Sequence, residues 1–179
     1  MPIYVALLRG INVGGSKVLK MELLREIMEG AGCTDVATYI ASGNVVFGHA
    51  SRSEAKLRKD LETAIAKASK LEVPVVLRTF AEMTKVVSAN PFPKSGGTEL
   101  HVLFCTTTPT AAAFAKLEST SFEPEAWAIA NREVYLKLPK GIGTSKLAGT
   151  ITRISPAKEA TARNWNTVEK LTAMAAERA

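Results

Sequence analysis

Apolar positions in the first half of the chain follow two periods, one typical of strands and one typical of helices. Apolar runs over 3–8 and 73–77 predict buried strands. Residues 20–29 instead repeat apolar side chains at helical spacing, and glycines at 30 and 32 predict the helix end. The predicted inner face of this helix consists of Leu23, Leu24, Ile27 and Met28.

A hairpin and a second helix are predicted between these elements. Short apolar runs over 36–40 and 45–48 flank Ser42-Gly43-Asn44, a composition typical of turns. The pattern Ser51-x-x-Glu54 is a capping box and predicts that a helix begins there. The resulting order, β-α-β-β-α-β, is the split arrangement of ferredoxin-like domains.

The second half repeats most of this order after a short helix and a linker. Thr79-x-x-Glu82 predicts the short helix, and the Pro/Gly-rich residues 90–97 predict the linker. Beyond it we expect a strand over 100–105, a helix capped by Thr108, a hairpin over 127–138, a helix-like segment from 141 and a final helix from about 167. This order lacks a clear closing strand.

The predicted fold class is therefore α+β, with two ferredoxin-like α/β sandwich subdomains (β-α-β-β-α-β type) in tandem, the second incomplete. We divide the chain into a first subdomain over 1–80, a short helix and linker over 81–98, and a second subdomain with a C-terminal helix over 99–179. The two halves are expected to be structural repeats that share one strand order.

Composition narrows the class of protein. The chain has 179 residues and a net charge of +6, a mild basic excess that permits phosphate-bearing partners. Cys33 and Cys105 are far apart, lie beside apolar residues and form no C-x-x-C pair, which favours buried thiols over a disulfide or metal site. No basic leader and no apolar stretch of membrane-spanning length are recognised, so a cytoplasmic protein is expected.

The loop after the first strand is the leading candidate for a ligand site. It carries Arg9, Gly10, Asn12, Gly14 and Gly15, so its backbone can approach a bound group closely while Arg and Asn offer donors. A glycine-rich loop between a strand and a helix is a plausible anion cradle. Its spacing matches neither G-x-G-x-x-G nor the phosphate loop G-x-x-x-x-G-K-[ST]. The alternative, that the glycines only turn the chain, stays open.

The predicted topology brings a second loop to the same place. In a β-α-β-β-α-β sheet the first two strands run in the same direction, so the end of the first strand lies beside the turn after the second. The turn residues Ser42, Gly43 and Asn44 should therefore lie beside the glycine-rich loop. We expect Arg9, Asn12, Ser42 and Asn44 to share one solvent-accessible pocket rim.

A second polar cluster lies at 161–167. Asn166 with Glu169 is interpreted as a capping box at the start of the final helix. This leaves Arg163 and Asn164 without a local explanation, beside Trp165, which is either core or a stacking platform. Arg163 and Asn164 are therefore candidate ligand contacts. If Arg163 serves the fold instead, it should be paired with a carboxylate or with helix carbonyls.

Three segments together resemble the bacterial family called domain of unknown function 1697. They are residues 4–15, 38–47 and 161–171, with a weaker match over 141–147. The resemblance implies a two-part α+β fold and a small cytoplasmic protein, and it implies no activity. Residues 148–152 depart from what looks like a charged helical segment in the family, which leaves helix continuity over 148–155 open.

Three functional classes follow from these residues. The first is a binding module for a phosphate-bearing small molecule, nucleotide or nucleic acid at the glycine-rich loop, and it is the leading hypothesis. The second is an enzyme of unknown reaction that uses Arg, Asn and Ser in polar loops; no catalytic residue is assigned, because no nucleophile or metal motif is present. The third is a structural or oligomeric scaffold without a ligand. No metal and no cofactor are indicated, and the oligomeric state is open.

Overall fold

The computed structural model describes residues 1–179, apart from the side chain of Lys116. The chain forms two compact units, one made of Met1–Thr84 with Leu171–Ala179 and the other of Lys85–Lys170. This division groups the C-terminal residues with the first unit, whereas the sequence-based division leaves them in the second. Within the first unit, Arg178 Nε lies 3.2 Å from Asp35 Oδ2.

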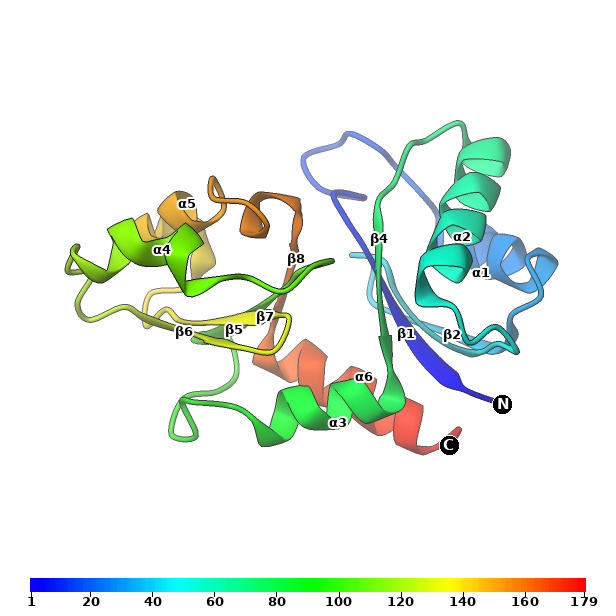
Figure 1. Cartoon of the computed structure of the whole chain (residues 1–179). Helices are drawn as coiled ribbons and strands as arrows, with labels where there is room; N and C mark the ends of the chain where they lie inside the picture. The colour runs from blue at the N-terminus through cyan, green and yellow to red at the C-terminus, as the bar shows by residue number, and fades with distance from the viewer. The chain divides into compact units, whose positions relative to one another are not determined.

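The first unit contains one antiparallel four-stranded sheet (Figure 1). Its strand order is β2-β3-β1-β4, which is the ferredoxin-like arrangement. The elements, in chain order, are β1 (Ile3–Leu8), α1 (Met21–Gly30), β2 (Thr34–Tyr39), β3 (Asn44–Gly48), α2 (Glu54–Ser69), β4 (Val75–Thr79) and α3 (Phe80–Ser88).

The second unit contains a second antiparallel four-stranded sheet, in the order β6-β7-β5-β8. Since each position matches the order β2-β3-β1-β4, the prediction of two structural repeats is confirmed. The elements are β5 (Leu100–Phe104), α4 (Ala111–Glu118), β6 (Ala126–Ala130), β7 (Glu133–Lys137), a 3-10 turn (Ile142–Thr144), α5 (Lys146–Ile151), a second 3-10 turn (Ala157–Glu159) and β8 (Thr161–Asn164). The last helix, α6 (Trp165–Ala176), begins in the second unit, and its residues from Leu171 onward belong to the first.

The prediction that the second sandwich is incomplete is wrong. Its closing strand is β8, which pairs with β5. The residues of β8, Thr-Ala-Arg-Asn, resemble a polar loop because the strand's buried positions are occupied by Thr161 and Arg163. The side chains of Thr161 and Arg163 are buried once β8 has joined the sheet. The pattern of apolar residues along the chain cannot reveal a strand whose buried side chains are polar.

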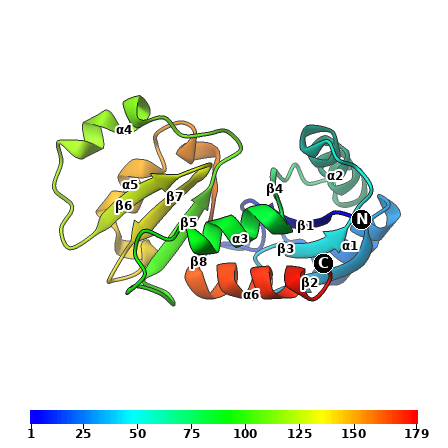
Figure 2. The same cartoon turned by 60° about the horizontal axis from the view of Figure 1, so that its bottom comes forward.

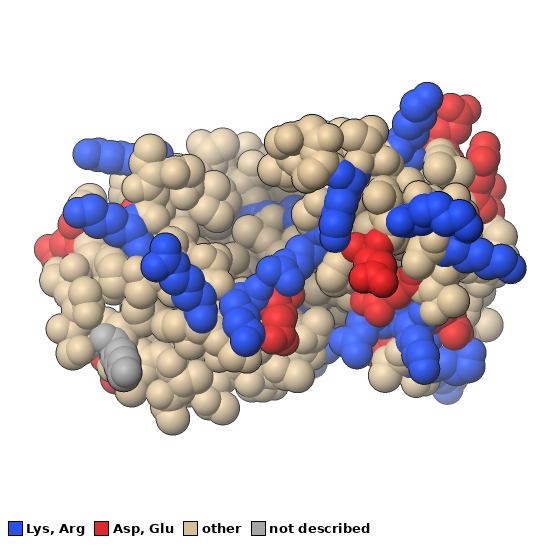
Figure 3. Space-filling model, turned by 90° about the horizontal axis from the view of Figure 1, so that it is seen from above, with Lys and Arg blue, Asp and Glu red and all other residues tan. Residues whose placement is uncertain are grey.

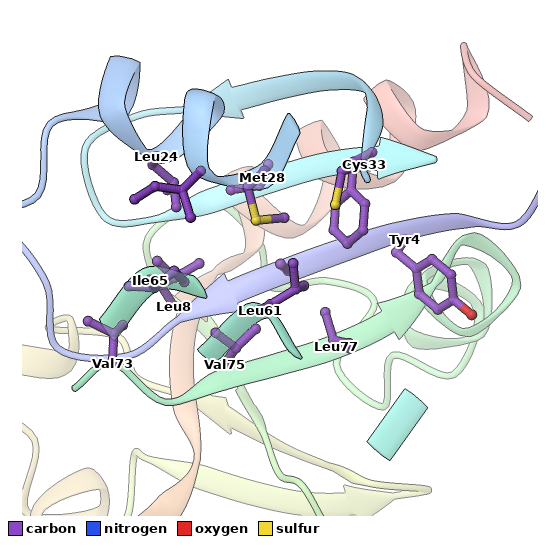
Figure 4. Packing of buried hydrophobic residues seen from close by; sticks show 14 of the residues in the cluster. Tyr4, Leu8, Leu24, Met28, Cys33, Leu61, Ile65, Val73, Val75 and Leu77 are labelled. Carbon is purple, nitrogen blue, oxygen red and sulfur yellow. The ribbon is translucent and has the colours of Figure 1, made fainter. Parts of the chain in front are cut away.

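The first core lies between the sheet and the two helices α1 and α2. Figure 4 shows Leu24 and Met28 of α1 and Leu61 and Ile65 of α2 directed toward the strands. On β1 the alternate residues Tyr4, Ala6 and Leu8 belong to this core, and the ring of Tyr4 stacks on Phe47 at 5.9 Å. In both helices the buried residues are apolar side chains that recur at helical spacing, as the sequence predicts.

The second core is built in the same way, with α4 and α5 over one face of the second sheet (Figure 2). Phe114 of α4 packs on Trp127 of β6, with ring centroids 5.7 Å apart. Of residues 148–155, whose helix continuity the sequence left open, 148–151 are the helical end of α5 and 152–155 form turns and a bend beyond it. Leu147, Ala148 and Ile151 of α5 are buried.

The capping box at the start of α3 is confirmed. The Thr79 backbone N–H donates to Glu82 Oε2 at 2.8 Å, and the Glu82 N–H donates to Thr79 Oγ1 at 3.2 Å. This reciprocal pair satisfies two N–H groups that the first turn of the helix leaves unpaired.

Three other predicted helix starts are displaced by two residues. Ser53, not Ser51, caps α2, and Thr110, not Thr108, caps α4. At α6 the cap is Asn164, whose Oδ1 accepts from the Thr167 N–H at 3.0 Å, and not Asn166. Several oxygen-bearing side chains precede each helix, and the cap is the one whose backbone stays extended just before the first turn.

Candidate functional site

The glycine-rich loop and the β2–β3 turn lie together at one end of the first sheet. We call residues 9–19 the glycine loop. The Leu8 N–H donates to the Gly43 carbonyl at 2.8 Å, and Asn12 Nδ2 donates to the Ala41 carbonyl at 2.6 Å. These contacts confirm that the topology places the two loops side by side.

Gly43 is required where the two loops meet. Its φ of +80° is a backbone conformation that residues with a side chain rarely adopt. An added Cβ would lie 2.7 Å from Leu8 Cβ and 2.7 Å from Ile11 Cδ1, both buried. The backbone approaches this closely only because position 43 has no side chain.

Asn12 holds the glycine loop closed. Its Nδ2 donates to the Leu19 carbonyl and its Oδ1 accepts from the Leu19 N–H, both at 2.9 Å. Together with the bond to Ala41, both amide hydrogens are donated to the protein. The side chain therefore shapes the loop and ties it to the β2–β3 turn.

Gly14 and Gly15 form the tip of the glycine loop. Their φ values of +62° and +76° match the central residues of a type I′ turn, and the flanking Ser16 N–H donates to the Val13 carbonyl at 3.4 Å. The backbone N–H groups of both glycines form no hydrogen bond with any described residue, and an added Cβ would meet nothing within 4 Å. The turn thus explains both glycines and also leaves two backbone donors without a partner among the described residues.

Ser42 and Asn44 are linked within the β2–β3 turn. The Asn44 side chain is fully buried, and its Nδ2 donates to the Tyr39 carbonyl at 2.9 Å and to Ser42 Oγ at 3.0 Å. Arg9 is half-buried, and its backbone N–H donates to the Pro74 carbonyl at 3.0 Å. The expectation that Asn44 lines a solvent-accessible rim is wrong, because its side chain is buried and bonded within the turn, whereas a common rim of Arg9, Asn12 and Ser42 stays a prediction.

A cavity of about 460 Å³ adjoins the glycine loop on its β4 side, and we call it the glycine-loop cavity. Lys17 of the loop and Lys59 of α2 line it, with the carboxylates of Glu62 and Glu72. Lys17 Nζ donates to the Glu72 carbonyl at 2.7 Å, and Glu62 Oε1 accepts from the Val75 N–H at 2.9 Å. These four residues were not predicted from the sequence, because charged side chains in loops and on the outer faces of helices usually contact only solvent.

Arg163 and Asn164 have partners within the second unit. Arg163 Nη1 donates to Thr161 Oγ1 at 2.7 Å and to the Ala162 carbonyl at 2.8 Å. Burial lowers the pKa of this guanidinium to about 10. Asn164 caps α6, so the fold accounts for it. A role for either residue in ligand binding stays a prediction.

The first unit carries a counterpart of Arg163 that the sequence analysis missed. Arg78 of β4 lies opposite Val5 of β1, as Arg163 of β8 lies opposite Val102 of β5. Arg78 is 1% exposed, and its Nη1 donates to the carbonyl of the preceding residue at 2.7 Å, as Arg163 does. The repeat therefore preserves a buried arginine, which points to a role in the sandwich itself.

None of the cysteine and histidine side chains belongs to the glycine loop. Cys33 and Cys105 are both buried, as predicted, and burial raises the pKa of Cys33 to about 12. His49 Nδ1 accepts from the Ser51 N–H at 3.0 Å, whereas burial lowers the pKa of His101. Within the described residues there is no group of three or more His, Cys, Asp or Glu placed to hold a metal ion. No helix in that part of the chain has the length and apolar character needed to cross a membrane.

Comparisons with known proteins agree with the family resemblance. The family whose pattern matches residues 1–135 is described as "Protein of unknown function (DUF1697)". Among solved structures the chain is similar to the conserved bacterial protein SP0830 from Streptococcus pneumoniae, with 24% identity and a TM-score of 0.78, covering 97% of this chain and 98% of that one. This likeness shows the fold alone. No curated protein matches the chain. Since the family pattern spans well over half of the sequence, the chain belongs to the DUF1697 family of proteins of unknown function.

Proposed function

We propose that the first unit binds a small phosphate-bearing ligand at the glycine loop. The observation that carries the proposal is the tip of this loop, where the N–H groups of the consecutive, exposed glycines Gly14 and Gly15 form no hydrogen bond with a described residue, in a loop whose Lys17 lines a cavity. Consecutive N–H groups in turns of this kind form anion-binding concavities. Gly10, with a φ of +70°, allows the chain to leave β1 in the required direction.

Lys17 and Lys59 supply positive charge at the glycine-loop cavity. Lys17 Nζ donates to the Glu72 carbonyl, and the side-chain ammonium of Lys59 forms no hydrogen bond or ion pair with any described residue. Glu62 and Glu72 offset part of this charge, so the loop N–H groups must supply a large share of the affinity. Over the face seen in Figure 3, basic and acidic side chains are interspersed. This charge pattern supports a small ligand more than a long nucleic acid, which needs a continuous basic surface.

The other candidate residues have different parts in this proposal. Asn12, Gly43 and Asn44 position the two loops, because their contacts are made within the protein. Arg9 and Ser42 are proposed as ligand contacts at the loop edges. Arg163 and Asn164 are left outside the proposed site, since bonds within the second unit account for them.

Thermal unfolding with inorganic pyrophosphate and AMP as probes tests the proposal. A ligand present at about a hundred times its dissociation constant stabilises by about 2.7 kcal/mol, which corresponds to about 5–10 °C in Tm for a chain of this size. We expect the double variant Lys17→Gln/Lys59→Gln to lose most of this shift, whereas Lys67→Gln, an exposed lysine of α2 outside the cavity, keeps it.

The double variant also has a built-in check on folding. Both side chains are exposed, so the Tm of the free protein should change little. No stabilisation of the wild-type protein by either probe, or equal losses in the cavity variant and in Lys67→Gln, would contradict the proposed function.

A further inference from the structure

A hollow of about 730 Å³ in the second unit lies between α4 and α5, as its lining residues show. These two helices cover one face of the second sheet (Figures 1 and 2). We call it the α4/α5 groove. Its volume falls in the range of about 300–1,000 Å³ that is typical of small-ligand pockets. It shares no residue with the glycine loop, so an inference from it is independent of the function proposed above.

The floor of the α4/α5 groove is apolar. Leu117 of α4 belongs to the core of the second unit, and Phe122 and Ile154 pack against that core while remaining half-buried. All three line the hollow. They offer an apolar ligand a surface that is already partly dehydrated, so covering it is favourable.

The charges at the edge of the groove have one sign. Its charged lining residues are Lys146 and Arg153, both exposed, and neither side chain forms an ion pair with a described residue. The glycine-loop cavity, by contrast, contains two carboxylates, and so does the neighbouring hollow beside Pro139, which Lys146 also lines, so Arg153 is the cation that belongs to the groove alone. The α4/α5 groove therefore complements an anion.

Gly149 opens the groove between the two cations. Gly149 follows Lys146 by three positions within α5, so these two residues share one stripe of the helix, and Arg153 follows just beyond the helix end at Ile151. An added Cβ there would meet nothing within 4 Å, so no close packing of the fold requires this glycine. Glycine in a helix interior weakens the helix relative to alanine. Its absent side chain does, however, leave room above the apolar floor.

We propose that the α4/α5 groove binds a small amphipathic carboxylate, with its acyl chain on the floor formed by Leu117, Phe122 and Ile154. The carboxylate pairs with Arg153, whose forked donors match its two oxygens, and Lys146 adds a second positive charge. Arg153 and Lys146 are ligand-binding residues in this assignment, and no reaction is implied.

Titration of the full-length protein with octanoate, followed by amide NMR shifts and calorimetry, tests this assignment. Octanoate should shift the amides of 146–154 and 117–122, and 1-octanol, which has the same chain without the charge, should bind at least about fivefold more weakly. Lys146→Gln and Arg153→Gln should each weaken octanoate binding by about the same factor. Lys158→Gln, an exposed lysine outside the groove, should not.

Two glycine variants test whether octanoate binds in the groove itself or is attracted only by the positive charge of the protein. Gly149→Leu fills the hollow and should abolish octanoate binding, whereas Gly143→Leu places the same side chain at another exposed glycine and should leave it unchanged. The assignment is overturned if octanoate does not bind, if its shifts lie elsewhere in the chain, or if Gly149→Leu binds it as tightly as Gly143→Leu does. Preferential binding of an acidic peptide over octanoate at the same amides would also overturn it.

Discussion

Replacement of Asn12 by alanine is expected to unfold the glycine loop. The change removes two bonds to the Leu19 backbone, both 2.9 Å long, and one of 2.6 Å to the Ala41 carbonyl. Leu19 is 1% exposed, so its N–H and carbonyl lose partners that water cannot easily replace. Each such bond contributes about 0.5–1.5 kcal/mol.

The backbone adds to this loss. Asn12 has a φ of 54°, and asparagine tolerates this left-handed conformation better than alanine does. Taking three bonds at about 1 kcal/mol each, with a reduced share for the exposed bond to Ala41, and about 1 kcal/mol of backbone strain, we expect Asn12→Ala to cost about 3–4 kcal/mol.

Two companion variants separate the hydrogen bonds from the backbone strain. Asn12→Gly removes the side chain but accepts positive φ, so it should be about 1 kcal/mol less destabilising than Asn12→Ala. Asn12→Asp keeps the acceptor for the Leu19 N–H but directs a carboxylate at the carbonyls of Leu19 and Ala41, so its stability should lie well below that of the wild type.

Urea denaturation followed by far-UV circular dichroism measures these losses. Amide hydrogen exchange at Leu19 and Leu8 reports whether the loop opens locally before the unit unfolds. If Asn12→Ala stays within about 0.5 kcal/mol of the wild type and Leu19 keeps its protection, the positioning role of Asn12 is refuted.

Three other predictions concern the fold around the candidate site. Gly43→Ala should lower the free energy of unfolding in urea by more than about 2 kcal/mol, because the new Cβ meets Leu8 and the φ of this residue is +80°. Gly14→Ala places its Cβ in open space and should lower it by only about 1 kcal/mol. Equal losses in the two variants would contradict the close approach of the two loops at Gly43. Burial raises the pKa of Cys33 to about 12, so its thiol should resist DTNB at pH 8 in the native protein. The stability that depends on this neutral thiol is present below pH 9 and is lost as pH rises toward 12; a Cys33→Ala variant with the same alkaline loss would count against this. Arg163→Gln removes bonds from a buried guanidinium to Thr161 and Ala162 and should lower the free energy of unfolding by about 1.5–3 kcal/mol in urea denaturation; unchanged stability would mean that Arg163 does not serve the fold.

The neighbouring positions of the glycine loop and the β2–β3 turn were predictable, because they follow from strand direction alone. Once 3–8 and 36–40 are identified as the first two strands of a split β-α-β, Gly43 must lie beside the end of β1. The sequence also identified the glycines as turn formers. It did not show that the Asn12 amide is committed to Leu19 and Ala41, because side-chain partners that distant in sequence leave no local pattern.

The two repeats illustrate what hydrophobic patterning reveals and what it hides. Strands such as β5 and the hairpin β6–β7 were found because their buried faces are apolar. Strand β8 was missed because Thr161 and Arg163 occupy its buried positions, and its polar residues resembled a ligand loop. A repeat of the first sheet requires a closing strand after α5, and this requirement of topology holds even where the residues are polar.

The sequence by itself determined the elements and their order, because apolar periodicity and turn residues act within a few positions of the chain. It thereby determined the tandem α+β fold and the end of the first sheet where the candidate loops meet. Only the tertiary structure decided which polar side chains form hydrogen bonds within the protein, namely those of Asn12, Asn44, Asn164 and Arg163. It also decided which cations line a hollow, such as Lys17 and Arg153. The physical reason is that hydrogen bonds and cavities depend on groups brought together from distant parts of the chain, and burial turns an ordinary polar side chain into a structural one.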